Sequence, residues 1–229
     1  ARQARDFQLR IKDNFDAIKA KAETSTSVGK LHDIESYHVH SMVFTRFDYS
    51  TGDAAGQNMV SRATFIACEW IHEQRPEMLH YMLSGNFDTE KKTSSVNLLK
   101  TRGKRVTAEI TVPREILMKH LRVAPEQIAY GQQISTLSAI LTNSSNNANH
   151  PANALAALYL ATGQDVANIG ESNQCTTYQR ATSKGDFYFS ITLPAVIMAT
   201  YGGGTALPTQ RECLRMLGCE GKVVFDEAM

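Results

Sequence analysis

Apolar residues recur at three- and four-residue spacing in several stretches of the chain, and this spacing predicts helices. In other stretches they alternate with polar residues or form short apolar runs, which is typical of strands. The predicted helices cover residues 6–21, 59–74, 113–121, 152–162 and 208–216. The predicted strands cover residues 42–49, 78–83, 104–112 and 187–193. Helices and strands in this mixture predict an α+β protein.

The order of these elements divides the chain into two parts. Residues 1–112 run helix, strand, helix, strand, loop, strand, and this order fits a split βαβ, ferredoxin-like unit. After Pro113 the character changes, with an uncharged stretch at 132–142 and a polar link at 143–151. We therefore expect a small domain at 1–112 and part of a larger helical and mixed domain at 113–229.

Composition and charge exclude several functional classes. The formal net charge is +1 without a long basic block, so nucleic acid is not an expected partner. No apolar run approaches the roughly 20 residues that a membrane helix needs, so no membrane segment is expected. The 4 cysteines form no CxxC pair, which argues against structural zinc and favours free thiols in a reducing cytoplasm.

A histidine pair gives the other candidate for metal binding. His38 and His40 alternate as on a strand, and a metal site is conceivable there. However, no carboxylate or cysteine cluster of recognisable spacing surrounds them, so ordinary surface histidines are the stronger interpretation. We therefore expect no metal.

A small-residue turn, Gly52–Met59, separates the predicted strand 42–49 from the predicted helix 59–74. A strand, a glycine turn and a helix start place several backbone N–H groups at one point, where an anion such as a pyrophosphate is favoured. An ordinary turn with Asp53 as the helix N-cap explains the same residues equally well. The glycines do not complete a dinucleotide fingerprint.

Three further stretches carry candidate chemistry. Ser84–Lys92 is a polar loop with dense charges directly after a predicted strand, a place where function often lies. Asp165 follows the helix end at Gly163, where a carboxylate needs a cationic partner, partial protonation or exposure to solvent. Gly202–Gly204 allow close approach of a ligand to the backbone, although a flexible turn is at least as compatible.

Taken in order, these motifs resemble the 3-hydroxy-3-methylglutaryl-coenzyme A (HMG-CoA) reductase family. The similarity runs from about Arg2 to Gly221 and is carried by the following stretches: Gly52–Ser61, Ser84–Lys92, Gly163-Gln164-Asp165, Tyr201–Thr205, Pro208-Thr209-Gln210 and Cys213–Gly218. The Gly-Gln-Asp sequence and the Lys91-Lys92 pair are closer to class I enzymes than to the other, bacterial class.

The resemblance implies reduction of the HMG-CoA thioester to mevalonate and coenzyme A, with two hydrides from a nicotinamide cofactor, as a step toward isoprenoids. It implies that the small domain binds the cofactor and the large domain the thioester. It further implies sites between the subunits of a homodimer or higher oligomer. NADPH is favoured, with Arg2 or Arg62 as candidates near a 2′-phosphate, whereas Asp48 is compatible with NADH.

The resemblance also assigns residues. Lys91 matches the cation near the reacting carbonyl oxygen, and Asp165 matches a buried aspartate that hydrogen-bonds this lysine. The positions that match cofactor contacts are Asp53, Ala55, Gly56, Asn58, Gly202, Gly203 and Gly204. The positions that match substrate contacts are Ser84, Asn86, Lys92, His150 and Asn153.

The chain departs from the family pattern at four places. Ala55 replaces a methionine, and Gln132-Gln133 stands where the family has a lysine that pairs with the substrate carboxylate. The catalytic glutamate and the general-acid histidine of the family have no match here, so we expect an incomplete chain that is inactive by itself. The alternatives are a cofactor-binding module with lost or altered catalysis, or an enzyme for a different acyl-CoA thioester. A purely structural ferredoxin-like scaffold explains neither Gly163-Gln164-Asp165 nor the glycine turn.

Overall fold

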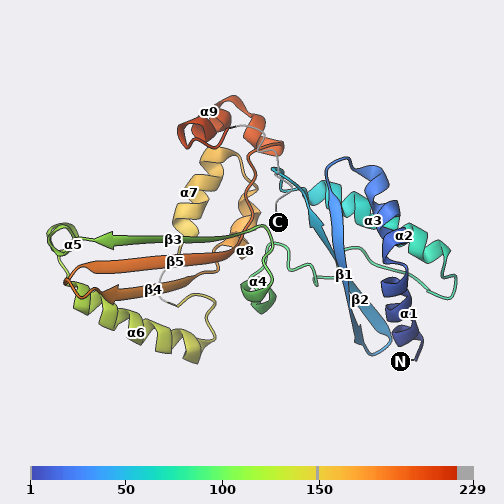
Figure 1. Cartoon of the computed structure of the whole chain (residues 1–229), viewed down its shortest axis with the longest axis horizontal. Helices are drawn as coiled ribbons and strands as arrows, with labels where there is room; N and C mark the ends of the chain where they lie inside the picture. Colours follow the sequence, from blue (N-terminus) through green and yellow to red (C-terminus); the bar gives the residue numbers. More distant parts are fainter. Residues whose placement is uncertain (1, 148–149, 221–229) are drawn as a thin grey trace. The chain divides into compact units, whose positions relative to one another are not determined.

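A computed structural model describes residues 2–147 and 150–220 (Figure 1). The described residues fall into two compact units. Unit 1 contains the chain up to Asp88 together with Ala199–Gly202, and unit 2 contains Thr89–Met198 together with Gly203–Glu220. The α+β class predicted from the sequence is confirmed, because both units combine helices with antiparallel strands.

Unit 1 is a β-hairpin with helices packed beside it (Figure 1). Its elements are α1 (Arg2–Asp13), α2 (Phe15–Ala22), the 3-10 turn η1 (Glu23–Ser25), β1 (Lys30–Val39), β2 (Met42–Ser50) and α3 (Gln57–Glu73). Strands β1 and β2 pair antiparallel around the two-residue turn His40-Ser41. The core lies between the hairpin and the helices and contains Ile11, Ile18, Ala22, Leu31, Ala63, Ala67 and Ile71.

Unit 2 is built on a three-stranded antiparallel sheet in the order β3-β5-β4. The strands are β3 (Lys104–Val112), β4 (Thr176–Ala181) and β5 (Phe187–Val196). The helical elements are α4 (Ser95–Leu99), α5 (Arg114–Leu121), α6 (Pro125–Thr142), α7 (Ala152–Thr162), η2 (Val166–Asn168), α8 (Ile169–Ser172), η3 (Gly203–Ala206) and α9 (Pro208–Met216). Helix α6 runs beside β4, and α7 packs against α8 and α9 (Figure 1).

Buried polar groups fix α7 and α8 to the end of β5. The Tyr159 hydroxyl donates to Ser172 Oγ at 2.8 Å, and the Ile197 N–H donates to the same oxygen at 3.1 Å. Tyr159 and Ser172 are fully buried. The end of α8 is therefore held in the interior of unit 2.

One sequence prediction of secondary structure was wrong, and one predicted helix forms as two helices, α1 and α2. The predicted strand 78–83 is irregular, and Leu79 is 91% exposed, because this apolar run finds no ladder partner among the described strands. The predicted helix 6–21 is interrupted at Asn14, whose side-chain amide donates to the Arg10 carbonyl at 2.8 Å. Such a side-chain bond competes with the helical backbone.

The placement of strand 104–112 also differs from the sequence prediction. That strand forms as β3, but it pairs with β5, more than 70 residues later in the chain, and so belongs to unit 2. The division therefore falls between Asp88 and Thr89 rather than after Val112. Strand β1, which is polar over most of its length, was not predicted and forms because β2 offers a complete antiparallel partner.

The helices give no candidate for a membrane span. Within residues 2–147 and 150–220, none combines the length and the apolar character needed to cross a bilayer.

Candidate functional site

The turn between β2 and α3 is a tight backbone structure centred on Gly56. Gly56 precedes the first helical residue, Gln57, with a left-handed φ of 71°. A Cβ built on Gly56 would lie 2.4 Å from Thr51 Cγ2, so glycine is required for both conformation and space. The Thr51 hydroxyl closes the turn by donating to the Ala54 carbonyl at 2.8 Å.

This turn presents a helix start that suits an anion. Among the described residues no side chain caps α3, and its first turn contains no acidic residue. No carboxylate of the first helical turn therefore offsets the N-terminal partial charge of α3. Asp53 is not the N-cap, contrary to the simpler alternative in the sequence analysis; its carbonyl instead accepts the Thr200 N–H at 3.0 Å. That bond brings the segment ending at Gly202 beside the turn.

In unit 2, Lys91 and Asp165 meet although 74 residues separate them. Lys91 Nζ lies 2.9 Å from Asp165 Oδ2, so the hydrogen bond expected between these side chains is present. The hydrogen bond to Asp165 raises the pKa of Lys91. The same bond, helped by the Ala167 N–H, lowers the pKa of Asp165. The pair is therefore an ammonium and a carboxylate at neutral pH.

The exposure of Asp165 corrects one expectation from the sequence. The side chain was expected to be buried, but it is 40% exposed, and Lys91 is 39% exposed. Asp165 lies outside α7 because the helix ends at Gly163, and its carboxylate accepts the Ala167 N–H at 3.1 Å at the start of η2. Both charged groups of the pair are thus accessible to a ligand.

Gly163 links the end of α7 to the glycine turn. Its φ is 71°, and a Cβ there would lie 2.3 Å from the Gly204 carbonyl oxygen. A Cβ on Gly204 would lie 2.5 Å from the Gly163 carbonyl oxygen. The two glycines thus allow direct backbone contact, which fixes the start of η3 next to the loop that carries Asp165. Gly202 and Gly203 also have positive φ values.

The loop that carries Lys91 has an unusual backbone. Ser84, Asn86, Thr89 and Lys91 all have φ values between 56° and 66°. Residues other than glycine rarely adopt this region, and such clusters occur where surrounding contacts enforce them. The fully buried Asn97 supplies such contacts: its Oδ1 accepts the Thr89 hydroxyl at 2.8 Å, and its Nδ2 donates to the Lys92 carbonyl at 3.3 Å.

Two charged residues that the sequence analysis missed also hold this loop. Glu171, with a fully buried side chain, accepts the Lys91 N–H at 3.2 Å and pairs with Arg102. Burial raises the pKa of Glu171, and Arg102 counteracts the rise. The signal that points to Glu171 in the sequence is weak, since a single charge in a short polar stretch normally faces solvent.

The expected substrate residues belong to different units and elements of the chain. Ser84 and Asn86 belong to unit 1, and the Ser84 hydroxyl donates to Asp88 Oδ2 at 3.1 Å. His150 and Asn153 are exposed near the start of α7, whereas Asp165 follows its other end, roughly 16 Å away along the helix axis. Lys92 directs Nζ to the Glu90 carbonyl at 3.0 Å. One copy of unit 2 therefore does not bring His150 and Asn153 to the Lys91–Asp165 pair.

Gln132 and Gln133, which stand where the family has a lysine, have different environments. Gln132 is buried, with Nε2 donating to the Asn147 carbonyl at 2.8 Å and Oε1 accepting the Thr177 hydroxyl at 3.1 Å. It thus joins α6 to β4. Gln133 is exposed, so it is the residue that could face a ligand in place of the expected lysine.

The hairpin of unit 1 carries the remaining residues considered for cofactor choice and for metal binding. Asp48 is paired with Arg46 at 3.2 Å, which offsets its charge near the end of β2. Carboxylate oxygens of Asp33, Glu35 and Asp48 lie within 4.8 Å of one another. His38 Nε2 is 2.5 Å from the His40 carbonyl oxygen, a contact within the hairpin turn. Acidic side chains commonly gather on surfaces in this way, so this arrangement does not alter the expectation that no metal is bound.

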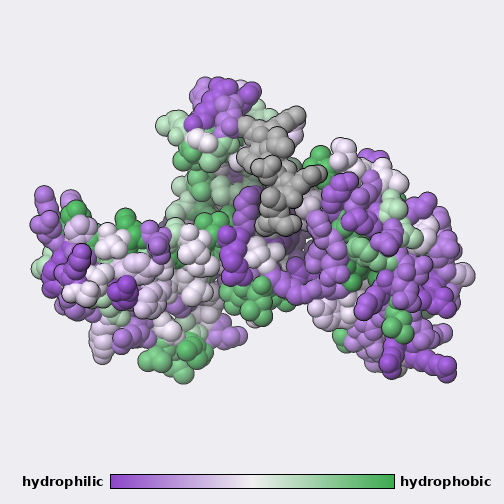
Figure 2. All heavy atoms as spheres, in the orientation of Figure 1, coloured by the Kyte–Doolittle hydropathy of each residue, from purple (hydrophilic) through white to green (hydrophobic). Residues whose placement is uncertain are grey.

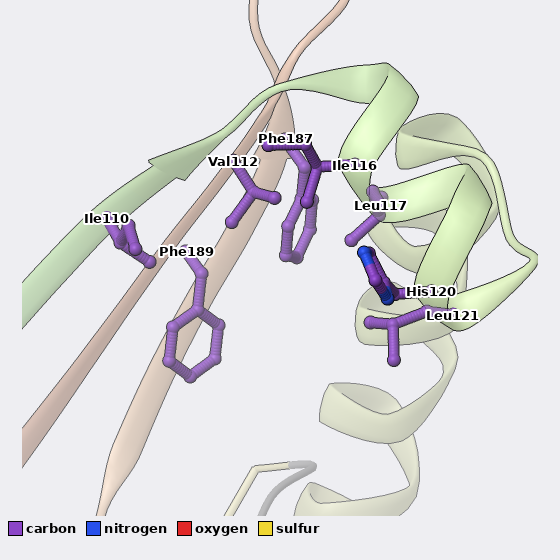
Figure 3. A pocket seen from close by; sticks show the side chains of 8 residues that line it. All are labelled: Ile110, Val112, Ile116, Leu117, His120, Leu121, Phe187 and Phe189. Atoms are coloured by element: carbon purple, nitrogen blue, oxygen red, sulfur yellow. The ribbon is translucent and has the colours of Figure 1, made fainter.

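Unit 2 also has an apolar pocket, which Figure 3 shows between α5 and the sheet. Its volume is about 300 Å³, and it is lined by Ile110, Val112, Ile116, Leu117, His120, Leu121, Phe187 and Phe189. Apart from the His120 ring, the labelled side chains are hydrocarbon (Figure 3). The pocket therefore lacks the charged groups that would recognise an acyl carboxylate or a phosphate.

The described residues thus present two sets of groups: a glycine-rich helix start that suits an anion, and an accessible lysine–aspartate pair that suits a carbonyl oxygen. Comparison with known proteins gives the family. The model for hydroxymethylglutaryl-coenzyme A reductase matches residues 1–228. The chain belongs to this family.

Individual relatives agree with this assignment. The chain is 40% identical over 223 residues to the 3-hydroxy-3-methylglutaryl-coenzyme A reductase of Pyrococcus abyssi, covering 96% of this chain and 55% of the relative. It is 44% identical over 221 residues to that of Methanothermobacter thermautotrophicus, covering 94% of this chain and 55% of the relative. The chain therefore spans about half the length of the curated relatives it matches.

A solved structure shares the fold. It is the class II 3-hydroxy-3-methylglutaryl-CoA reductase from Streptococcus pneumoniae bound to NADPH in open conformations. The TM-score is 0.68 at 18% identity, over 94% of this chain and 60% of that chain. The family predicted from the sequence is confirmed. The likeness to class I stays a prediction from Gly163-Gln164-Asp165 and Lys91-Lys92.

Replacing Asp165 by Asn should lower the pKa of Lys91 toward the ordinary lysine value of about 10.4, because the hydrogen bond to the carboxylate is the largest cause of the rise. Lys91 should then lose its proton, and react with acetic anhydride, at lower pH than in the unchanged protein. Mass spectrometry of the peptide that contains Lys91 measures this reaction.

The matched control is Glu90→Gln, because Glu90 Oε1 is 3.8 Å from Lys91 Nζ and contributes less to the rise. Equal shifts in the two variants would contradict the assignment.

The contribution of the Lys91–Asp165 pair to the free energy of unfolding should be present above the pKa of about 3.9 that Asp has in the unfolded chain. It should be lost as the pH falls through the lowered pKa that Asp165 has in the folded protein. At this exposure the contribution is at most about 1 kcal/mol.

Proposed function

We propose that the protein reduces HMG-CoA to mevalonate and coenzyme A with NADPH. The observation that carries this proposal is the 2.9 Å contact between Lys91 Nζ and Asp165 Oδ2 on an accessible, strained loop. Family membership supplies the substrate class, since the curated relatives are named as this reductase.

In this proposal Lys91 acts on the carbonyl oxygen of the thioester. Negative charge develops on that oxygen as the thioester is reduced, and a preorganised ammonium stabilises it. Lys91 carries its proton near neutral pH, and its contact with Asp165 holds the ammonium in place. The ammonium is the proposed donor of the proton to the forming alcohol. Asp165 has a lowered pKa, so its role is to orient Lys91 rather than to donate a proton itself.

The cofactor is assigned to the turn before α3. The start of α3, which follows the left-handed Gly56 and has no side-chain cap in the described chain, fits a nucleotide phosphate. The residues that would hold NADPH are Asp53, Ala55, Gly56, Asn58 and the Gly202–Gly204 turn, and the cofactor would supply the hydride. The pairing of Asp48 with Arg46 weakens the argument for NADH, because that carboxylate is already engaged.

The substrate groups are assigned to Ser84, Asn86, Lys92, His150 and Asn153. Lys92 is the cation proposed for the substrate carboxylate, because Gln133 offers no charge there. If Gln133 instead marks a changed substrate or lost turnover, the chain is a cofactor-binding relative of the reductases. The activity measurement below separates these functions.

We further propose that the protein works as a homodimer or larger oligomer. His150 and Asn153 lie away from Lys91 and Asp165 within one copy, so a second subunit would complete the site. Helix α6 supports this proposal, because it exposes a row of large apolar side chains at helical spacing: Tyr130, Ile134, Leu137, Ile140 and Leu141. Figure 2 shows hydrophobic surface in the region of α6.

The cytoplasm is the proposed location. All 4 cysteines of the chain are free. Burial raises the pKa of Cys68 and of Cys175 to about 11, so both remain neutral thiols rather than reactive thiolates.

Replacing Lys91 by Ala should lower turnover by at least about 100-fold, because it removes the cation proposed for the developing oxyanion. The affinity for NADPH should stay close to that of the unchanged protein. Consumption of NADPH with HMG-CoA, followed by absorbance on the full natural protein, measures the first quantity, and fluorescence titration measures the second. No consumption by the unchanged protein, with NADPH still bound, would identify a binding module instead.

Replacing Gly56 by Ala should weaken NADPH binding by about tenfold or more. The left-handed φ costs an L-residue about 1–2 kcal/mol, and the contact with Thr51 adds to this. Gly131→Ala is the matched control, because nothing lies within 4 Å of a Cβ built there. Fluorescence titration with NADPH compares them; unchanged affinity in a folded Gly56→Ala protein would remove this turn from the cofactor site.

Light scattering of the purified natural protein should give a mass of at least two subunits. Replacing Leu137 and Ile140 by Glu should reduce this mass, because charges on the exposed face of α6 would oppose its burial in an interface. The control is Leu79→Glu, because Leu79 is exposed in the irregular segment of unit 1. A single-subunit mass for the unchanged protein would contradict the oligomer proposal.

A further inference from the structure

The backbone of Lys91 needs external support to keep its conformation. Its φ of 60° belongs to the left-handed region, which is unfavourable for a residue with a Cβ. The direction of the side chain depends on this backbone conformation, and so does the contact between Nζ and Asp165 Oδ2. Groups that hold the Lys91 peptide units therefore control where the ammonium lies.

Glu171 holds Lys91 from its N–H side. The Lys91 N–H donates to Glu171 Oε1 at 3.2 Å, although 80 residues separate them in the chain. The Glu171 side chain is completely buried. Its position is in turn fixed by α8, where the neighbouring Ser172 bonds to Tyr159 and to the Ile197 backbone.

Arg102 pairs with Glu171 and opposes the rise in the pKa of Glu171 that burial causes. Arg102 Nη1 contacts the same Oε1 atom that accepts the Lys91 N–H. Arg102 is itself placed by the following residue, Gly103, where a Cβ would lie 2.3 Å from the Val196 carbonyl oxygen. Arg102 therefore extends from a turn that lies tightly against the end of β5.

Gly170 holds Lys91 from its carbonyl side. A Cβ built on Gly170 would lie 2.5 Å from the Lys91 carbonyl oxygen, so the absence of a side chain lets the two backbones touch. Gly170 and Glu171 are consecutive residues of α8. One turn of helix thus contacts both the N–H and the carbonyl of Lys91.

The energetics of the pair argue for a role other than simple stabilisation. Burying a carboxylate and a guanidinium is costly, and apolar residues of similar size often stabilise a protein as well or better. In addition, Glu171 Oε2 is buried without a hydrogen-bond partner in the described part of the chain. Such an arrangement is explained if its charged acceptor has a geometric task at Lys91.

We propose that Glu171, oriented by its contact with Arg102, is a positioning residue that fixes the Lys91 backbone so that Nζ meets Asp165. The inference rests on the proposed function for its effect on turnover, but its geometric content concerns Lys91 alone. Glu171 does not act on the substrate in this arrangement. It acts through the peptide N–H of Lys91.

The central test replaces the pair with apolar residues in the full natural protein. The double variant Arg102→Met with Glu171→Leu removes both charges, leaves no buried ion behind and should retain a melting temperature close to the unchanged value. It also removes the acceptor for the Lys91 N–H. We expect kcat to fall roughly 10- to 100-fold, as for a small misplacement of a reacting group, with KM for NADPH within about twofold.

A second readout follows Lys91 directly. The charged groups that act on its amine are Asp165 and Glu90, which raise its pKa, and Arg102, which lowers it. If the double variant separates Lys91 from Asp165, its reaction with acetic anhydride should shift toward the pH found for Asp165→Asn. Loss of Arg102 alone would shift the reaction in the opposite direction, so the sign of the change separates the two causes.

Two single variants test the contacts to the Lys91 backbone separately. Glu171→Gln keeps an oxygen that can accept the Lys91 N–H, so it should retain much more activity than the double variant. Gly170→Ala leaves Glu171 and Arg102 unchanged but pushes against the Lys91 carbonyl, so it should reproduce the lower kcat and the shifted Lys91 reactivity. It serves as the independent variant if the double variant fails to fold.

Leu117→Ala is the stability control, because Leu117 is buried on α5 at 3% exposure and belongs to the apolar pocket. It should lower the melting temperature without moving the Lys91 profile. An unchanged Lys91 profile in folded double-variant and Gly170→Ala proteins would overturn the inference, as would the same shift in Leu117→Ala. Absence of NADPH consumption by the unchanged protein would count against the proposed function alone, since the Lys91 profile is measured without turnover.

Discussion

The hydrogen bond between Lys91 Nζ and Asp165 Oδ2 is the interaction on which the candidate site depends, and it is formed by two partly exposed side chains. An exposed ion pair has little strength of its own, because solvent screens it and both side chains lose conformational freedom. Its geometry must therefore come from the backbones that carry it. In this protein those backbones are held by buried contacts on both sides: Asn97 and α8 hold the lysine loop, and Gly163 holds the segment of Asp165.

Close contact between two backbones holds both the lysine loop and the segment of Asp165. Gly163 meets Gly204, and Gly170 meets the Lys91 carbonyl, at distances that any side chain would prevent. Such contacts transmit position better than a long side chain does, because peptide units have few soft dihedrals. A glycine beside a candidate functional residue therefore indicates where another segment approaches, and this explains why Gly163 precedes Asp165 and Gly170 precedes Glu171.

The sequence predicted the local elements and the candidate pair better than it predicted long-range partners. Helices 59–74, 152–162 and 208–216 correspond to α3, α7 and α9, since each has a clear apolar pattern or end signal. Strand pairing was less accessible: residues 78–83 have a strand-like pattern but no partner among the described strands, and 104–112 pairs with a strand of unit 2. Propensity describes a segment alone, whereas a strand also needs a partner that the segment does not specify.

The local sequence also does not specify the long-range partners of charged residues. Lys91 and Asp165 were identified together through motifs of a known family, whereas Glu171 and Arg102 belong to no such motif and are revealed only by burial and distance. Gln132 and Gln133 make a related point, because adjacent identical residues have different roles once α6 forms: the first is bonded to β4 and the second faces outward. A change of charge at the outward position alters what a ligand meets without disturbing the fold. In the proposed function, the carboxylate of HMG-CoA would then need a cation elsewhere. Lys92 is adjacent to the positioned Lys91, and its carbonyl accepts a hydrogen bond from Asn97, which also holds Thr89.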